Sequence, residues 1–200
     1  MEALVVIITV VSYAFKGVAR ERKNSDNLLL NILLYETARD LKENGVARAR
    51  AHKDVSIVFA DVQNFTKIAS GLEPTILVKV LDQYFSMFDA IIKEFGLEKI
   101  KTIRDAYMFV SGLENSNNSA LSAVEATLKI LEDAASKQQY MLGEHGVKFK
   151  FRVGMHTGNI VSGVVGNVKY AFDIWGDAVN TASRMETNSI PGKINVSDKT

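Results

Sequence analysis

The chain contains no cysteine among its 200 residues, and this absence removes several kinds of chemistry at once. Disulfide bonds, thiolate metal sites and cysteine nucleophiles are all excluded. Histidine is scarce as well, because the sequence holds only His52, His145 and His156, and none of them stands in an HExxH motif. Zinc chemistry based on histidine is therefore not expected.

The sequence also lacks an excess of charge of either sign. Lys and Arg number 24 against 23 Asp and Glu, so the formal net charge is +1. This balance gives no reason to expect nucleic acid or another strongly anionic partner, and any phosphate chemistry must come from a local site. The hydrophobic content of 47% is enough to build the core of one compact domain.

A third absence is an apolar run long enough to cross a membrane alone. Residues 3–15 are almost entirely apolar, but a helix of this length spans roughly 20 Å where a bilayer core needs about 30 Å. Basic residues follow directly, at Lys16, Arg20, Arg22 and Lys23. This order is typical of the inner end of a transmembrane helix. We therefore expect residues 1–15 to end a membrane helix of a longer protein, on its cytoplasmic face, with an ordinary buried helix or strand as the alternative. The piece alone is expected to be soluble.

Residues 24–44 show the periodicity of one helix, with Ser25 or Asp26 as a candidate N-cap and Asn44-Gly45 as its end. Its apolar side chains fall on one narrow stripe, formed by Leu30, Leu33, Leu34, Ala38 and Leu41. Such a stripe fits a short parallel coiled coil between two subunits, and fits equally a helix packed on its own domain. Residues 16–49 are therefore predicted to be a linker helix, with both alternatives open.

From residue 50 onward, short apolar runs alternate with helical patterns. Strands are predicted at 55–60, 99–103, 106–110, 147–153, 160–165, 170–174 and 193–196. The first core helix has Pro74 near its start and Gly96 at its end. The second has the apolar positions Leu121, Val124, Leu128, Leu131 and Ala135, and a third helix is predicted at 177–186. This order predicts an α+β fold, a ferredoxin-like βαββαβ sandwich preceded by an N-terminal helix.

Two carboxylates, Asp61 and Asp105, each stand at or beside the end of an apolar strand. A hard cation such as Mg²⁺ is usually held by one or two carboxylates together with phosphate oxygens. If the two strands are neighbours, the aspartates form one metal site. An aspartate at a strand end is more often a turn or cap residue, so the spacing alone leaves both interpretations open.

Four segments carry a more specific signal. They are residues 59–66 (FADVQNFT), 99–108 (KIKTIRDAYM), 154–158 (GMHTG) with 163–166 (GVVG), and 172–185 (FDIWGDAVNTASRM). In this order and spacing they resemble class III adenylyl and guanylyl cyclases, over about residues 50–200. Residues 27–33 are similar to the helix that often precedes this domain in membrane-bound members.

The resemblance implies an adenylate cyclase, a phosphorus-oxygen lyase that converts ATP to 3′,5′-cyclic AMP and pyrophosphate with two divalent ions, Mg²⁺ or Mn²⁺. By position it makes Asp61 and Asp105 the metal-binding aspartates, with the carbonyl of Val62 as a further ligand. The resemblance also places three backbone amides near the phosphates, those of Asn64, Phe65 and Thr66.

The resemblance also assigns residues that contact the nucleoside and the transition state. Asn180 would orient the ribose, and Arg184 would stabilise charge on the α-phosphate. Lys101 and Asp173 stand at the positions that read the base, where guanylyl relatives typically have Glu and Cys. A donor Lys and an acceptor Asp match N1 and the N6 amine of adenine, whereas guanine would leave buried groups unpaired. ATP is therefore expected to be preferred over GTP.

In this family the metal aspartates come from one subunit, and the base-reading and transition-state residues come from the other. A chain that carries both sets is expected to form a head-to-tail homodimer with two composite sites. The family domain continues past residue 200, to a lysine that binds the terminal phosphates, so the cyclase domain at 50–200 is expected to be truncated at its C-terminus.

Two residues depart from the family pattern near the site. Arg104 and Asn64 both stand where the family usually has glycine. If the turn at Arg104 needs a positive φ, the arginine costs on the order of 1 kcal/mol or more. This departure and the truncation favour an alternative, a cyclase-like dimerisation or nucleotide-sensing module without turnover. A guanylyl cyclase is the second alternative. A ferredoxin-like RNA-binding module is disfavoured, because the sequence lacks exposed aromatics on a strand platform and a basic surplus.

Overall fold

The structure, a computed structural model, describes residues 13, 15–21, 23, 25, 33, 35–113, 119–166 and 170–200. They fall into two compact units. The first consists of residues 1–49 with 163–172, and the second of residues 50–162 with 173–200. Every residue predicted to bind metal, substrate or the transition state belongs to the second unit.

The first unit contains α2 (Tyr35–Asn44). It ends as predicted at Asn44, since Gly45 has a φ of 70° and its N–H donates to the carbonyl of Leu41 at 3.0 Å. The prediction of one helix over 24–44 is wrong, because Ser25 is itself helical and Leu33 lies in a bend. Ser25 is therefore no N-cap.

The membrane and coiled-coil predictions for residues 1–49 stay predictions. Most of the apolar segment 1–15 lies outside the described residues, as do Leu30 and Leu34 of the predicted stripe. Leu33 and Ala38 are already buried in the single chain, which agrees with the alternative that this stripe packs on its own chain. Among the residues whose placement is described, no helix is both long and apolar enough to cross a membrane.

The second unit carries nearly all of the remaining elements, and β4 and β5 extend into the first. The strands are β1 (Arg50–Val62), β2 (Glu98–Ile103), β3 (Ala106–Ser111), β4 (Phe151–Val165), β5 (Ala171–Trp175) and β6 (Ile194–Val196). The helices are α3 (Phe65–Ala69), α4 (Pro74–Glu94), α5 (Ser119–His145) and α6 (Asp177–Thr187). The predicted βαββαβ order is confirmed, and only α3 was not expected.

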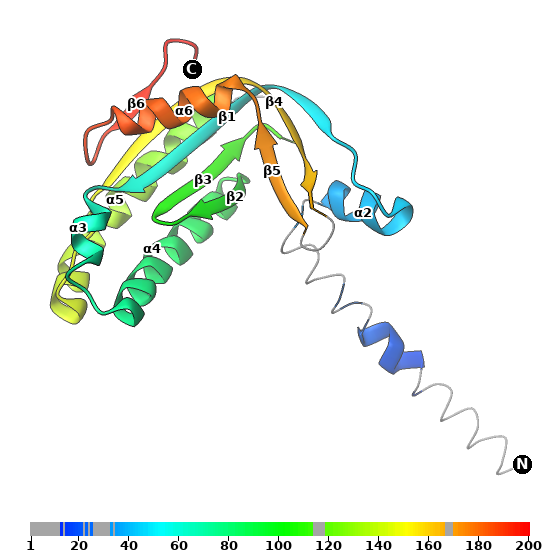
Figure 1. Cartoon of the computed structure of the whole chain (residues 1–200), viewed down its shortest axis with the longest axis horizontal. Coiled ribbons are helices and arrows are strands. Elements are labelled where there is room, and N and C mark those ends of the chain that lie inside the picture. Colours follow the sequence, from blue (N-terminus) through cyan, green and yellow to red (C-terminus); the bar gives the residue numbers. More distant parts are fainter. Residues whose placement is uncertain are drawn as a thin grey trace, which may run out of the picture. The chain divides into compact units, whose positions relative to one another are not determined.

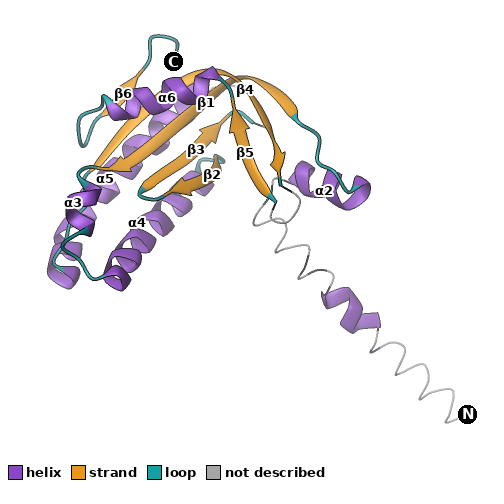
Figure 2. Ribbon diagram, in the orientation of Figure 1, coloured by secondary structure: helices purple, strands orange, loops and turns teal. Residues whose placement is uncertain are grey.

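One sheet organises these elements, with the strand order β2-β3-β1-β4-β5 (Figure 1). Strand β1 pairs antiparallel with both β3 and β4, and β6 adds a short parallel pairing to β4. The first four strands therefore have the order of a ferredoxin-like sandwich, as predicted. Figure 2 shows helices α4 and α5 together on one side of the strands and α6 on the other.

Alternation along β1 determines which side chains face which helices. Val58, Ala60 and Val62 point into the main core beneath α4 and α5. Phe59 lies opposite Gly154 on β4, and Gly154 faces the backbone of α6. Asp61 comes two residues after Phe59 and points to the same face of the strand, so its carboxylate lies on the α6 side of the sheet.

Two local predictions are wrong. The strands predicted at 147–153 and 160–165 are one strand, β4, which starts at Phe151 and runs through the glycines between them. In α5, Leu121 and Leu128 are 56% and 55% exposed, whereas Ala123, Ala126 and Ile130 are buried. Small side chains at Ala123 and Ala126 allow α5 to pack closely, and Leu121 and Leu128 fall on its outer side, whereas Val124 and Leu131 of the predicted stripe do pack against the core.

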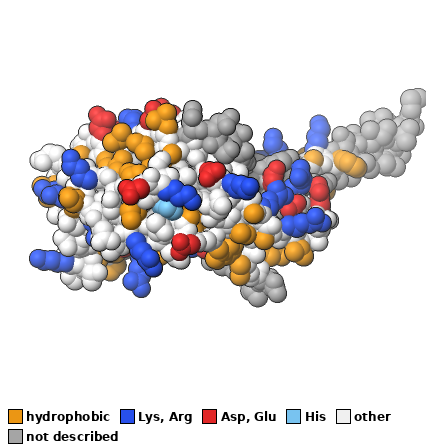
Figure 3. All heavy atoms as spheres, turned by 90° about the horizontal axis from the view of Figure 1, so that it is seen from above, with side chains coloured by type: hydrophobic (Ala, Val, Ile, Leu, Met, Phe, Trp, Pro, Cys, Tyr) orange, Lys and Arg blue, Asp and Glu red, His pale blue; other side chains and the backbone are white. Residues whose placement is uncertain are grey.

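Basic and acidic side chains are interspersed over the face of the molecule seen in Figure 3. That face has no field of one sign, in keeping with the net charge of +1. Local charge is therefore what matters for binding.

Gly154 is required by the close approach of α6 to β4. A Cβ atom at this position would lie 1.8 Å from the backbone nitrogen of Glu186 and 2.4 Å from its Cα. Because backbone must shift to make room, we expect Gly154→Ala to lower the free energy of unfolding by about 3 kcal/mol in urea titrations.

The matched control is Gly143→Ala in α5, where a new Cβ meets nothing within 4 Å. This change is expected to stabilise the protein by up to about 1 kcal/mol, because alanine has the higher helix propensity. Equal effects of the two substitutions would show that α6 does not pack tightly at Gly154.

Candidate functional site

The two predicted metal-binding aspartates lie together at one end of the β1–β3 pair. Ala60 pairs with Tyr107, so Asp61 comes level with the turn that precedes β3, where Asp105 lies. The side chains of Asp61 and Asp105 are within hydrogen-bonding reach of each other. Strands β1 and β3 are therefore neighbours, as a single metal site formed by the two aspartates requires.

The proximity of these two carboxyl groups changes the protonation of Asp105. Burial, and then the hydrogen bond and negative charge of Asp61, raise the pKa of Asp105 to about 6. Two partly buried carboxylates side by side are unfavourable unless a proton or a cation lies between them. Together with the carbonyl of Val62, they form a set of hard oxygen ligands that fits Mg²⁺ or Mn²⁺.

The protein's ligands alone do not complete such a site. Within the described ranges, no three Asp, Glu, His or Cys side chains are grouped so that they could hold a metal ion. The remaining ligands would be backbone, substrate or water oxygens, as is usual for Mg²⁺ in phosphate chemistry.

A partly buried arginine lies beside Asp61. Arg152 is directly opposite Asp61 in the β1–β4 pairing, and its Nη2 donates to Oδ2 of Asp61 at 2.9 Å. The same Nη2 lies 3.0 Å from Oε1 of Glu186, an ion pair that lacks hydrogen-bond geometry. Burial and the charge of Asp61 raise the pKa of Glu186. Arg152 thus links Asp61 to α6 and balances charge at this end of the sheet.

Sequence analysis missed both Arg152 and Glu186, although signals for each exist. Arg152 alternates with the buried Phe151 and Val153, which places it on the other side of its strand. Glu186 continues the inward face of α6 that starts with the small residues Ala178 and Ala182. Their meeting at Asp61 depends on the β1–β4 register and on the close approach at Gly154, which no local pattern reveals.

The turn after β1 is built around Asn64. This residue has left-handed φ and ψ of 58° and 29°, and it precedes α3 as its N-cap. Its carbonyl accepts from the N–H groups of Lys67 at 3.0 Å and Ile68 at 3.1 Å. The first N–H groups of a helix have no partner within it, so those of Phe65 and Thr66 are free to meet another acceptor.

The two predicted base-reading residues contact each other. Nζ of Lys101 on β2 donates to Oδ2 of Asp173 on β5 at 2.5 Å, and Oδ1 of Asp173 accepts from the N–H of Ile174 at 2.9 Å. The two strands stand at opposite ends of the strand order. The fold thus brings Lys101 and Asp173 together, and each satisfies the other's charge when no base is bound.

Asn180 and Arg184 lie four residues apart on the exposed side of α6, opposite the buried Ala178 and Ala182. In the part of the chain that the structure describes, neither side chain contacts Asp61 or Asp105. One chain therefore assembles the aspartate pair and the Lys101–Asp173 pair, but it does not bring the α6 residues to the aspartates.

Arg104 adopts the strained conformation that its position demands. Its φ is 58°, in the left-handed region where glycine is favoured. We expect Arg104→Gly to raise the free energy of unfolding by about 1 kcal/mol, measured by chemical denaturation. Lys79→Gly, in the helical backbone of α4, should instead lower it by about 1 kcal/mol. A loss of stability in Arg104→Gly would mean that the arginine side chain stabilises the turn.

Residues 47–200 match the family described as "Adenylate and Guanylate cyclase catalytic domain". An adenylate cyclase of Mycobacterium tuberculosis is 36% identical over 202 residues, which cover 97% of this chain and 45% of that protein. Atrial natriuretic peptide receptor 2 of Homo sapiens is 38% identical over 181 residues, which cover 90% of this chain and 17% of the receptor. The chain thus spans less than half of either relative.

Solved structures of cyclases share the fold. The catalytic core of a rhodopsin-guanylyl cyclase with converted specificity, in complex with ATPalphaS, has a TM-score of 0.68 at 35% identity, and the match covers 76% of this chain and 81% of that one. The adenylyl cyclase CyaB from P. aeruginosa has a TM-score of 0.69 at 25% identity, over 76% and 79% of the two chains. With the family match over residues 47–200, these findings show that the chain belongs to the class III adenylyl and guanylyl cyclase catalytic domain family.

Proposed function

We propose that this domain is an adenylyl cyclase, which converts ATP to 3′,5′-cyclic AMP and pyrophosphate at sites shared between two copies of the chain. The proposal rests on two observations: the convergence of Asp61 with Asp105, and the contact of a second pair, Lys101 with Asp173, whose hydrogen-bonding groups match adenine. The first pair supports metal-dependent phosphoryl chemistry, and the second supports the choice of base.

At the phosphate end, the chain offers two kinds of group. Bound by Asp61, Asp105 and the carbonyl of Val62, two divalent ions would activate the ribose 3′-hydroxyl and neutralise the leaving pyrophosphate. The N–H groups of Phe65 and Thr66, free at the start of α3, would receive phosphate oxygens. As the bond from O3′ to the α-phosphorus forms, the proton of the 3′-hydroxyl passes to water. The bond from the α-phosphorus to the oxygen that bridges it to the β-phosphorus breaks, and its electron pair leaves with pyrophosphate.

At the base end, Lys101 and Asp173 favour adenine. Nζ of Lys101 can donate only, and an ionised Asp173 can accept only, which match N1 and the N6 amine respectively. Guanine presents a donor at N1 and an acceptor at O6, so both contacts would be mismatched. Guanylate cyclases are among the similar proteins, but this pair of side chains favours ATP over GTP.

The positions of Asn180 and Arg184 support a second subunit. Both are exposed on α6 and are without contact to the aspartates of their own chain, among the residues described. In a head-to-tail homodimer, these residues would complete the site of the partner, where the planar guanidinium of Arg184 can give two hydrogen bonds to phosphate oxygens. A dimer with two-fold symmetry then has two equivalent sites.

A module without turnover is the alternative, and strain at Arg104 is the observation that favours it. The strain does not displace Asp105, which remains within reach of Asp61. We therefore favour catalysis.

Complementation between two inactive variants tests the shared site. Asp105→Asn and Arg184→Ala should each abolish cyclic AMP formation in separate preparations. After mixing and exchange, half of the dimers are mixed and each has one intact site, so about a quarter of wild-type activity should return. Mixing Asp61→Asn with Asp105→Asn should restore nothing. If the first mixture also stays inactive while mixed dimers form, the site does not combine residues of two chains.

A further inference from the structure

Strand β2 has one residue more than the stretch of β3 with which it pairs. Lys99 lies opposite Phe109, and the next pair joins Lys101 to Met108, the residue just before Phe109. Ile100 therefore has no residue opposite it in the ladder, which is the arrangement of a β-bulge. Bulges beside functional sites commonly turn a side chain in a new direction.

The bulge sends two nearby lysines to opposite faces of β2. Residues directly opposite each other in an antiparallel pair point to the same face, so Lys99 shares the face of Phe109, in the main core. Lys101 shares the face of Met108 and contacts Asp173 on β5. In a regular strand, residues two apart share one face. Without the bulge, Lys99 would therefore lie on the side of Lys101, about 7 Å away along the strand.

Two residues hold Lys99 on the α4 side of the sheet. Its Nζ donates to both carboxylate oxygens of Asp89 on α4, at 2.7 and 3.0 Å. The same Nζ lies 4.8 Å from the centre of the Tyr107 ring on β3, and the hydroxyl of Tyr107 donates to Oδ1 of Asp89. Tyr107 is fully buried, which fixes its own position. We call Asp89, Lys99 and Tyr107 the bulge anchor.

The ion pair of the bulge anchor adds little to stability by itself. The side chains of Lys99 and Asp89 are 36% and 47% exposed, and ion pairs this open to solvent contribute little to the free energy of unfolding. The contact instead fixes a direction, because Nζ reaches Asp89 only when Lys99 points to the α4 side of β2.

The two ends of the β2–β3 hairpin are held in different registers. At the turn, Ile103 pairs with Ala106, and this register continues to Lys101. At the far end, the bulge anchor holds Lys99 one position away from where this register would place it. The extra residue therefore falls between them, at Ile100. Strand β2 ends the strand order, and β3 is its one neighbour among the described strands, so its far end can slip if the bulge anchor is lost.

We propose that the bulge anchor sets base specificity by keeping Lys99 away from Asp173, so that the base meets Lys101 and Asp173 without a second ammonium group. The inference rests on the proposed function in assigning base recognition to Lys101 and Asp173. A slip by one residue would bring Lys99 to the face of Lys101. Its ammonium group would then compete with the N6 amine of adenine for the oxygens of Asp173.

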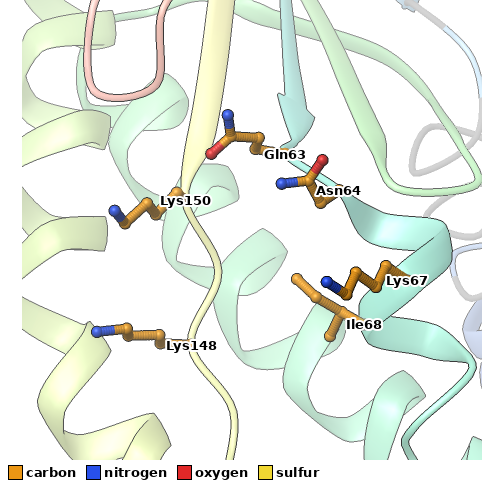
Figure 4. A pocket seen from close by; sticks show the side chains of 6 residues that line it. All are labelled: Gln63, Asn64, Lys67, Ile68, Lys148 and Lys150. Carbon is orange, nitrogen blue, oxygen red and sulfur yellow. The ribbon is translucent and has the colours of Figure 1, made fainter.

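The bulge anchor is separate from the phosphate end of the proposed site. A cavity of about 430 Å³ lies at that end, beside the turn that follows β1 (Figure 4). None of its lining residues belongs to α4, β2 or β3; they are Gln63, Asn64, Lys67, Ile68, Lys148 and Lys150. Changes to the bulge anchor are therefore expected to act on the base and to leave the phosphate end intact.

The test is Asp89→Asn, which removes the charge partner of Lys99 and keeps the size of the side chain. The ratio of kcat/KM for ATP over GTP should fall by about tenfold or more, mainly through a higher KM for ATP. Adding Lys99→Met to this variant should restore the ratio, because the ammonium group is gone and methionine packs well against the Tyr107 ring. A purely structural loss would not be restored by a second substitution in the same contact.

The matched control is Asp133→Asn, which frees Lys129 from the same kind of ion pair on α5. It should leave the ratio unchanged. An unchanged ratio in Asp89→Asn, or a ratio that the double variant fails to restore, would overturn the proposal.

Nuclear Overhauser contacts between β2 and β3 report the register of the full chain without any need for activity. In the wild type the backbone of Lys99 should face that of Phe109, and in Asp89→Asn the backbone of Ile100 should take its place. An Asp89→Asn variant that keeps the wild-type register would overturn the proposal. A wild type that prefers GTP would refute the proposed function instead, and the register change would still show that the bulge anchor fixes the bulge.

Discussion

We expect Asp105→Asn to lower the rate of cyclic AMP formation by about 1000-fold or more, and to raise the temperature at which the metal-free protein unfolds. The activity falls because an amide holds a divalent ion far less well than a carboxylate, and metal stabilisation of the transition state is worth several kcal/mol. The stability rises because the amide removes the repulsion between two neighbouring carboxylates.

The stability effect has a defined pH dependence. The pKa of Asp105 is raised from its ordinary value of 3.8 to about 6 in the folded protein, so the folded state binds its proton more tightly than the unfolded state. Its favourable contribution is full below about pH 4 and is lost as the pH rises through 6. The melting temperature of Asp105→Asn should therefore equal that of the wild type at pH 4 and exceed it by a few degrees at pH 7.5. The difference stays this small because the site is partly exposed to solvent. Addition of Mg²⁺ should stabilise the wild type and leave the variant unchanged.

The control is Asp82→Asn, at an exposed aspartate of α4. It should keep wild-type activity, and Mg²⁺ should raise its melting temperature by as much as it raises that of the wild type. If Asp105→Asn retained its activity, or if Mg²⁺ stabilised Asp105→Asn as much as the wild type, the aspartate pair would not be the metal site.

Replacing the Lys101–Asp173 pair is expected to change the preferred nucleotide. Lys101→Glu with Asp173→Cys puts an acceptor opposite N1 of guanine and a weak donor opposite O6. The ratio of kcat/KM for ATP over GTP should fall by about 1000-fold or more. The new side chains form hydrogen bonds with guanine, and they leave the N1 and N6 groups of adenine mismatched.

Another lysine–aspartate pair in the same domain supplies the control for this change. Lys129 and Asp133 on α5 lie 3.1 Å apart and make the same kind of ion pair. Lys129→Glu with Asp133→Cys should leave the ratio unchanged. An unchanged ratio in the Lys101 and Asp173 double variant would mean that these residues do not read the base.

Local sequence patterns predicted most of the second unit. Helix α4 starts at Pro74 because proline suits the first turn of a helix, and β2 and β3 flank the turn at Arg104 and Asp105 as the apolar runs indicate. The pattern was correct only in part for α5: Val124 and Leu131 pack against the core as predicted, but Leu121 and Leu128 are exposed and the small residues Ala123 and Ala126 are buried instead.

The candidate site was predictable only in part. Its two aspartates and the pair proposed to read the base stand in motifs, so the resemblance pointed to them. Arg152 and Glu186 became visible only with the β1–β4 register and with the close approach that Gly154 permits. The contact of Lys101 with Asp173 likewise joins residues 72 positions apart in the chain. Tertiary geometry of this kind leaves no trace in local spacing.

The most direct measurement compares formation of cyclic AMP from ATP and of cyclic GMP from GTP by this chain, each with Mg²⁺ and with Mn²⁺. The account predicts metal-dependent cyclic AMP formation that exceeds cyclic GMP formation by about 100-fold or more. A folded, dimeric chain that forms neither product, or that forms mainly cyclic GMP, would contradict it.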